Sequence, residues 1–229
     1  MSDPVTVGIV DYGMGNRRSV QKALDHVGAR TLLTADAHQL RASEGLVVPG
    51  VGAFPQGMRN LGDLGLDELI RDCAGEGRPV LGICLGMQLL FDRSDELTLT
   101  DGLGLLPGHV SRLEAGGLRI PHIGWNEVSF RRPSPLTVGL PADGCPFYHV
   151  HSLAAHPQEL DDIFATAVYG ERFATMVARG NVFGVQFHPE KSSADGLRVL
   201  RNFVERCRAR PPGAIAGGAG WPGSVSLRA

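Results

Sequence analysis

The feature that most constrains the fold is a cysteine with a glycine two residues before it and another two residues after it: Gly82, Cys84 and Gly86. An apolar run over residues 79–83 leads into this cysteine, and a helical pattern over residues 87–91 leads out of it. A strand-to-helix turn of this kind is the cysteine version of a nucleophile elbow, where the sharp turn leaves little room for neighbouring side chains. The elbow exposes the cysteine above the sheet, and the N-terminus of the following helix favours its thiolate.

A base for this nucleophile is found much later in the chain, in the sequence His188-Pro189-Glu190. A histidine can pair with the thiol, and a carboxylate two residues on can hold the imidazole in one tautomer. The alternative is a small buried core cysteine, the commonest fate of a free thiol. The flanking glycines together with the late histidine argue against that alternative. Cys84, His188 and Glu190 are therefore predicted to be nucleophile, base and orienting carboxylate.

Composition limits the classes of protein that fit. The chain has 229 residues, of which 43% are hydrophobic and 31 are glycine, which suits one large α/β domain with many tight turns. A net charge of −2 gives no electrostatic case for binding nucleic acid or an anionic membrane. No apolar run approaches the roughly 20 residues of a membrane span. The first residues lack the basic and apolar regions of a signal peptide.

The cysteines argue against zinc and against a disulfide framework. They are far apart in the chain and form no C-x-x-C pair. A reducing cytoplasm is the expected compartment, and a working thiol at Cys84 requires it. The four cysteines are Cys73, Cys84, Cys145 and Cys207.

Apolar strands alternate with helical patterns over the first ninety residues, which predicts a doubly wound parallel sheet. A single domain is expected over residues 1–210, and the proline- and glycine-rich tail, residues 211–229, is predicted to be disordered. The expected strands are residues 5–10, 30–34, 45–48, 79–83, 164–168, 173–178 and 182–187, with short β-like runs at 104–113, 119–128 and 146–152. The expected helices are residues 19–27, 54–74 with breaks near Gly62 and Gly65, and 195–209.

Other motifs admit two interpretations. The run Gly50-Val51-Gly52 suits either backbone donors for an oxyanion or a plain turn. His149 and His151 share one face of a strand, where packing beside a polar site is favoured over metal ligation for want of a third ligand. Trp125 and Asn126 fit either a surface turn or a partner contact. A dinucleotide-binding loop at Gly13-Met14-Gly15 fails because position 18 is arginine.

Together these segments resemble the class I, triad-type glutamine amidotransferases, and within them the glutaminase subunits of imidazole glycerol phosphate synthases. The resemblance covers roughly residues 5–208. Two departures from the family pattern lie close together: Leu153 stands where the family has an aromatic residue, and His149 interrupts an aromatic run. The matching segments are residues 11–16, 49–54, 82–91, 102–108, 121–126, 151–152 and 186–193.

The resemblance implies a flavodoxin-like three-layer α/β sandwich, with a mostly parallel central sheet and a smaller antiparallel sheet. It implies hydrolysis of L-glutamine to glutamate and ammonia, with no metal and no organic cofactor. The ammonia would pass to a (β/α)8-barrel cyclase, the partner in a heterodimer, for histidine biosynthesis. Implied oxyanion-hole residues are Val51, Gly52 and Leu85; implied glutamine-binding residues are Gly50, Gly52, Gln88, Glu96, His151 and Ser152; candidate interface residues are Asn16, Trp125, Asn126 and Lys191.

Two alternatives stay open at this point. The triad also fits a glutaminase subunit that serves pyridoxal phosphate, purine, folate or pyrimidine synthesis. A cysteine peptidase or chaperone of the flavodoxin-like superfamily has an elbow cysteine too, but typically lacks the carboxylate that follows the histidine.

Overall fold

A computed structural model describes residues 3–209, so the predicted disordered tail lies outside the described residues. Five parallel strands form one half of the sheet, in the order β2-β1-β3-β4-β13. β1, β3, β4 and β13 are nearly continuous apolar runs, as expected for a sheet covered on both faces, whereas the edge strand β2 is only partly buried. Their bounds are β1 Thr6–Val10, β2 Arg30–Thr34, β3 Gly45–Gly50, β4 Val80–Cys84 and β13 Val182–Val185.

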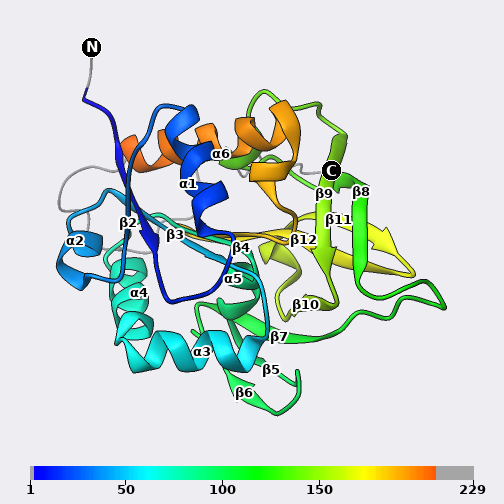
Figure 1. The fold of residues 1–229 in the computed structure, drawn as a ribbon. Coiled ribbons are helices and arrows are strands. Elements are labelled where there is room, and N and C mark those ends of the chain that lie inside the picture. The colour runs from blue at the N-terminus through cyan, green and yellow to red at the C-terminus, as the bar shows by residue number, and fades with distance from the viewer. Residues whose placement is uncertain (1–2, 210–229) are drawn as a thin grey trace, which may run out of the picture.

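Strands that pair antiparallel, except for the parallel pair β5 and β7, continue the same sheet. β12 joins the two parts because it pairs with β13 (Figure 1). From β12 the sheet runs on through β10, β7, β5 and β6, while β11, β8 and β9 branch from its other side. The bounds are β5 Phe91–Ser94, β6 Thr100–Asp101, β7 Leu106–Arg112, β8 His122–Phe130, β9 Gly144–His151, β10 Leu153–Pro157, β11 Ile163–Tyr169 and β12 Glu171–Arg179.

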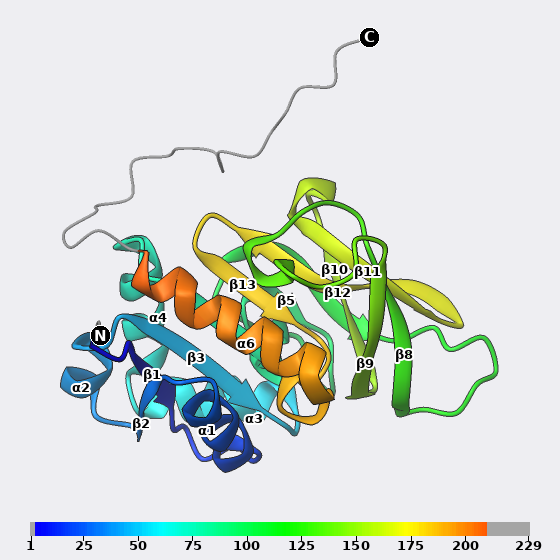
Figure 2. The same ribbon diagram turned by 90° about the horizontal axis from the view of Figure 1, so that it is seen from above.

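Helices cover both faces of the parallel part and create two apolar cores. α1 and α6 lie on one face, and α2, α3 and α4 lie on the other (Figures 1 and 2). The predicted three-layer α/β sandwich is confirmed. The helices are α1 Arg17–His26, α2 Ala37–Arg41, α3 Phe54–Asp63, α4 Leu66–Gly75, α5 Leu85–Leu89 and α6 Ser193–Arg208; 3-10 turns cover η1 Pro135–Thr137, η2 Leu160–Asp162 and η3 Pro189–Lys191.

Several elements differ from the sequence-based expectation. The helix after the elbow was expected to reach Phe91, but α5 ends at Leu89 and Phe91 begins β5. All five residues of α5 are buried. The apolar run therefore reflects a short, fully buried helix and not the apolar face of a longer one. The strand that leads to His188 ends at Val185 instead of residue 187. Helix α2 and strand β10 were not predicted.

The predicted break between residues 62 and 65 is confirmed. α3 ends at Asp63, and Gly65 adopts a φ of 65° before α4 begins. Positive φ costs glycine little, so the chain can turn between the two helices there. Within residues 3–209, the structure contains no helix that combines the length and the apolar character needed to cross a membrane.

Candidate active site

Cys84 is the last residue of β4 and has the backbone geometry of a nucleophile elbow. Its φ of 54° and ψ of −110° are strained for a residue with a side chain. A Cβ atom at position 86 would overlap the carbonyl oxygen of Val48, and one at position 82 would meet the backbone of Gly86. Both glycines are therefore required by close backbone approach, which is the physical reason for the G-x-C-x-G spacing.

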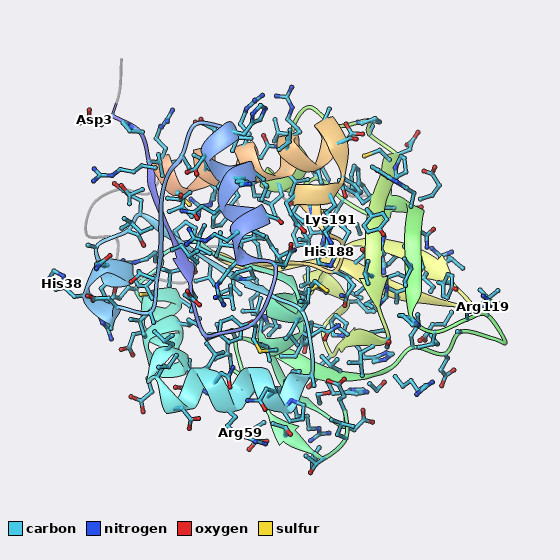
Figure 3. All side chains as sticks on the ribbon, viewed as in Figure 1. Asp3, His38, Arg59, Arg119, His188 and Lys191 are labelled. Atoms are coloured by element: carbon cyan, nitrogen blue, oxygen red, sulfur yellow. The ribbon has the colours of Figure 1, made fainter. Side chains whose placement is uncertain are left out.

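His188 and Glu190 meet beside this elbow. The segment that follows β13 brings His188 to the end of the sheet, and β13 is the parallel neighbour of β4. Nδ1 of His188 donates to Oε1 of Glu190 over 2.8 Å, and both side chains are almost fully buried. Within the described residues the other ring nitrogen, Nε2, makes no hydrogen bond to nitrogen or oxygen. It is the atom left for Cys84. Figure 3 shows His188 in the middle of the molecule, between the parallel strands and β9.

The electrostatics of His188 favour its protonated form. Burial lowers the pKa of His188, but the hydrogen bonds and charges of Cys84 and Glu190 outweigh burial and raise the pKa to about 9. A protonated histidine beside a sulfur anion is the resting state that cysteine nucleophiles use.

Asn16 belongs to this cluster, a contact that the sequence did not predict. Its Nδ2 donates to Oε1 of Glu190 over 2.6 Å and lies 3.3 Å from Nδ1 of His188, and its role at the interface stays a prediction. Asn16 has a φ of 70°, a left-handed conformation that asparagine tolerates better than most residues. The turn from β1 into α1 thus carries an amide onto the triad.

A cavity of about 260 Å³ opens beside Cys84. Almost every residue expected to bind glutamine or to form the oxyanion hole lines it. Gly50 is the exception; it lies in β3 opposite Cys84 in the strand register, and a Cβ atom there would strike the hydroxyl of Tyr12. The cavity is lined by Val51, Gly52, Cys84, Leu85, Gln88, Glu96, Pro121, Val150, His151, Ser152 and Leu153.

Two polar side chains of this cavity are held by hydrogen bonds to neighbouring backbone and side-chain groups. Oε2 of Glu96 accepts a hydrogen bond of 2.6 Å from the backbone N–H of Phe54, at the start of α3. Nε2 of Gln88 donates to Oε1 of Gln186 at 3.0 Å and to the carbonyl oxygen of Leu153 at 3.5 Å. Since both amide hydrogens of Gln88 are used inside the protein, its oxygen is the atom of that amide left for a substrate.

Three buried histidines support the wall of the cavity. Nδ1 of His151 donates to the carbonyl oxygen of Leu153 over 2.7 Å, so its Nε2 accepts from Nδ1 of His122 at 2.9 Å. Burial lowers the pKa of His151 to about 4 and lowers the pKa values of His149 and His122 as well. These neutral, hydrogen-bonded rings fit the packing interpretation favoured above. Among residues 3–209, no group of three or more His, Cys, Asp or Glu side chains is placed to hold a metal ion.

The remaining interface candidates differ in exposure. Trp125 on β8 is 53% exposed, its neighbour on the same face, Ile123, is 59% exposed, and Lys191 is exposed in η3 (Figure 3). Asn126 points to the other face of β8, where Nδ2 donates to the carbonyl oxygen of Val168 over 3.0 Å. Nδ2 of Asn126 also lies 3.3 Å from Nε2 of His122. The alternation along β8 therefore puts Ile123 and Trp125 on its exposed face and Asn126 on a hydrogen-bonded inner face.

A family model described as glutamine amidotransferase class-I matches residues 8–207, and the chain belongs to that family. Among its relatives are the imidazole glycerol phosphate synthase subunits called HisH. The one from Moorella thermoacetica is 52% identical over 202 residues, which are 88% of this chain and 95% of that relative. The one from Gloeobacter violaceus is 45% identical over 219 residues, 94% of this chain and 96% of the relative. The expected resemblance to this branch of the class is confirmed.

Solved structures show the same fold at low sequence identity. A protein from Thermoplasma acidophilum, described as part of a putative GMP synthase, has a TM-score of 0.70 and 21% identity, covering 91% of this chain and 96% of its own. PurLQS from Thermotoga maritima has a TM-score of 0.72 and 20% identity, covering 90% and 99%. The sheet and its helices are thus those of the class I glutamine amidotransferase fold.

Proposed function

We propose that this chain is the glutaminase subunit of an imidazole glycerol phosphate synthase, which hydrolyses L-glutamine and delivers the ammonia to a cyclase subunit. The observation that carries the proposal is the buried His188–Glu190 pair at the Cys84 elbow, beside a cavity lined by polar groups. The high identity to the HisH subunits favours histidine biosynthesis over the pyridoxal phosphate, purine, folate and pyrimidine alternatives.

Acylation begins at the Cys84 sulfur. The thiolate attacks the side-chain amide carbon of glutamine, and the carbonyl electrons move onto oxygen. The backbone N–H of Leu85 and an N–H from the Val51–Gly52 segment are the donors for that oxyanion. His188 gives its proton to the departing nitrogen, so ammonia leaves and a thioester to Cys84 remains.

Deacylation uses the same groups in reverse. Neutral His188 removes a proton from water as the water oxygen attacks the thioester. The tetrahedral intermediate collapses, the Cys84 thiolate leaves, and glutamate is released. Glu190 keeps Nδ1–H of His188 engaged throughout, so that Nε2 faces the reacting atoms.

The remaining groups of the cavity would bind the α-amino and α-carboxylate groups of glutamine. Gln88, Glu96, His151 and Ser152 line it, together with the backbone of the Gly50–Gly52 segment. The Glu96 carboxylate suits the α-amino group of the substrate. The small volume suits a single amino acid better than a peptide, which disfavours the peptidase alternative.

The partner follows from the fate of ammonia. Ammonia released into water is protonated and ceases to be a nucleophile, so the chain would dock onto a (β/α)8-barrel cyclase in a heterodimer and release ammonia into it. The cyclase would use it to form imidazole glycerol phosphate and AICAR. Asn16, Trp125, Asn126 and Lys191 are the proposed interface residues, and the reducing cytoplasm is the proposed compartment.

Co-purification with candidate synthases tests this proposal. The chain should form a 1:1 complex with a barrel cyclase, and the complex should turn over its ribonucleotide substrate with either glutamine or ammonium salt as nitrogen donor. A chain that instead bound a synthase of purine, folate, pyrimidine or pyridoxal phosphate formation, and not the cyclase, would contradict the pathway assigned.

A further inference from the structure

The segment that carries His188 and Glu190 has another side chain, Gln186, that points at the nucleophile Cys84. Residues 186–188 follow the end of β13, and their side chains divide between the apolar core and the nucleophile. Phe187 faces the core, where its ring stacks on that of Phe147 with centroids 4.0 Å apart. Gln186 and His188 both face Cys84, because each has a side-chain hydrogen bond to its sulfur, and Gln186 is fully buried.

The amide of Gln186 reaches the sulfur atom. Its Nε2 lies 3.7 Å from Sγ of Cys84, a distance suited to an N–H···S hydrogen bond. The neutral thiol has a separate acceptor, the carbonyl oxygen of Val150 at 3.6 Å. When the sulfur loses its proton it can only accept, and the described groups that can then donate to it are Gln186 and protonated His188.

Gln88 fixes which end of the Gln186 amide faces the sulfur. The Leu153 carbonyl oxygen can only accept, which makes the atom of Gln88 beside it the NH2 group. The same NH2 group donates to the oxygen of Gln186 over 3.0 Å. Turning the Gln186 amide around would set two NH2 groups against each other in a buried site. The stable arrangement therefore presents the Gln186 N–H to Cys84.

We propose that Gln186 is a catalytic residue that donates a hydrogen bond to the Cys84 sulfur whenever it carries negative charge. The sulfur is anionic before it attacks the substrate amide and again when it leaves the thioester. A fixed donor stabilises the anion at both points without any reorganisation. Gln88 then acts as a positioning residue for Gln186, in addition to its role in lining the substrate cavity.

Other titratable groups also face the Cys84 sulfur and influence its pKa independently of Gln186. His188, with Glu190 behind it, approaches from the segment after β13, and His151 lines the cavity from β9. Tyr12 approaches from the loop after β1, but burial and the nearby Cys84 raise its pKa, and its hydroxyl donates to the carbonyl oxygen of Pro49 over 2.7 Å. These groups are unchanged by a substitution at 186, so the effect of Gln186 can be measured separately.

The test is the pH profile of Cys84 alkylation by iodoacetamide in the full-length chain, read by peptide mass spectrometry. Gln186→Met keeps the side-chain length and removes the donor. Because a hydrogen bond to a charged group contributes a factor of about ten or more, the midpoint of the profile should rise by about one pH unit. Gln158→Met, on the exposed loop after β10, is the matched control and should reproduce the wild-type profile.

Gln186→Asn provides the second variant, because it keeps a polar amide but withdraws the donor from the sulfur. It should raise the midpoint as Gln186→Met does. If the methionine variant does not fold, the asparagine variant alone tests the hydrogen bond from Gln186 to Cys84. A folded variant at 186 with the wild-type midpoint would overturn the proposal. Although the catalytic role rests on the proposed function, alkylation needs neither glutamine nor a partner. A shifted profile, together with a cyclase complex that releases no glutamate from glutamine, would therefore refute the function and leave the hydrogen bond standing.

Discussion

The side-chain amide of Asn16 donates to Oε1 of Glu190 over 2.6 Å, although 174 residues separate the two along the chain. The same carboxylate oxygen accepts the 2.8 Å hydrogen bond from Nδ1 of His188. Within residues 3–209 the other carboxylate oxygen, Oε2, is buried without a hydrogen-bond partner. The orientation of Glu190 therefore depends on Asn16 and His188 together.

Asn16→Ala should lower the rate of glutamate release by about ten- to a hundred-fold, because a hydrogen bond to a buried carboxylate typically contributes about 1.5–3 kcal/mol. Steady-state assays of the complex with its cyclase would measure the change. Asn202→Ala removes a similar amide on α6, which donates to the carbonyl oxygens of Leu136 and Val138 away from the site. A loss in the Asn202 variant equal to that in the Asn16 variant would contradict a specific role for Asn16.

Glu190→Gln should slow glutamine hydrolysis less than His188→Ala. Glutamine at 190 can still accept a hydrogen bond from Nδ1 of His188, whereas alanine at 188 removes the acid and base, a loss of about 10²- to 10⁴-fold. Both variants can be compared in glutaminase assays at saturating glutamine. Equal losses, or a larger loss for Glu190→Gln, would argue against the roles assigned to the two residues.

The neutral histidines beside the cavity should make the protein less stable in mild acid. Burial holds the pKa of His151 at about 4, against about 6.5 in the unfolded chain, and lowers the pKa of His149 in the same direction. The unfolded state therefore binds more protons, and stability is lost as pH falls from about 6.5 towards 4. His151 alone would account for about 3 kcal/mol over that range.

The pKa of His188 is shifted in the opposite direction, so His188 does not contribute to this loss of stability in acid. Its pKa is raised to about 9, so it is protonated in both states below pH 6.5, and its stabilising effect is lost only as pH rises towards 9. Urea unfolding at pH 7 and pH 4.5 measures the acid loss. His149→Phe, which keeps a buried ring and removes one titrating group, should show a smaller loss between these two values. An unchanged loss in this variant would mean that other groups control the acid transition.

The sequence carried more information about the chemistry than about the contacts around it. The glycines at 82 and 86 and the carboxylate two residues after His188 are local patterns, and each has a steric or chemical cause that can be recognised without coordinates. Apolar runs similarly predicted the parallel strands. Helix α2 is only five residues long and begins at an Asp36 cap, and such a short element leaves no periodicity to detect.

The hydrogen bonds made by Asn16 and Gln186 required the structure for different reasons. Asn16 reaches Glu190 only because the turn after β1 and the segment after β13 meet in space, and neither segment encodes that meeting locally. Gln186 did leave a signal, since it lies two residues before His188 in the same short segment. Its partners, Gln88 and Cys84, come from the elbow helix and strand, and only the pairing of β13 with β4 brings them together.

Binding of the cyclase should raise the glutaminase rate of this chain by about a hundred- to a thousand-fold, the typical contribution of one preorganised oxyanion donor. The expectation rests on the Gly50–Gly52 segment, where Gly52 has a φ of 122° and flanking glycines permit either peptide orientation at Val51. Glutamate release is measured for the chain alone, with the cyclase, and with the cyclase and its ligand. A free chain that already released glutamate at the rate of the liganded complex would contradict activation by the cyclase.

Nitrogen transfer by the complex that contains Cys84→Ala tests most directly whether Cys84 is the nucleophile that releases ammonia. Product formation by the cyclase is followed with glutamine as nitrogen donor, and then with ammonium salt at a pH where free ammonia is present. Glutamine-dependent synthesis should be abolished while ammonia-dependent synthesis keeps the wild-type rate, because the thiol serves only to liberate ammonia. Synthesis from glutamine at the wild-type rate in this variant would show that Cys84 is not the nucleophile.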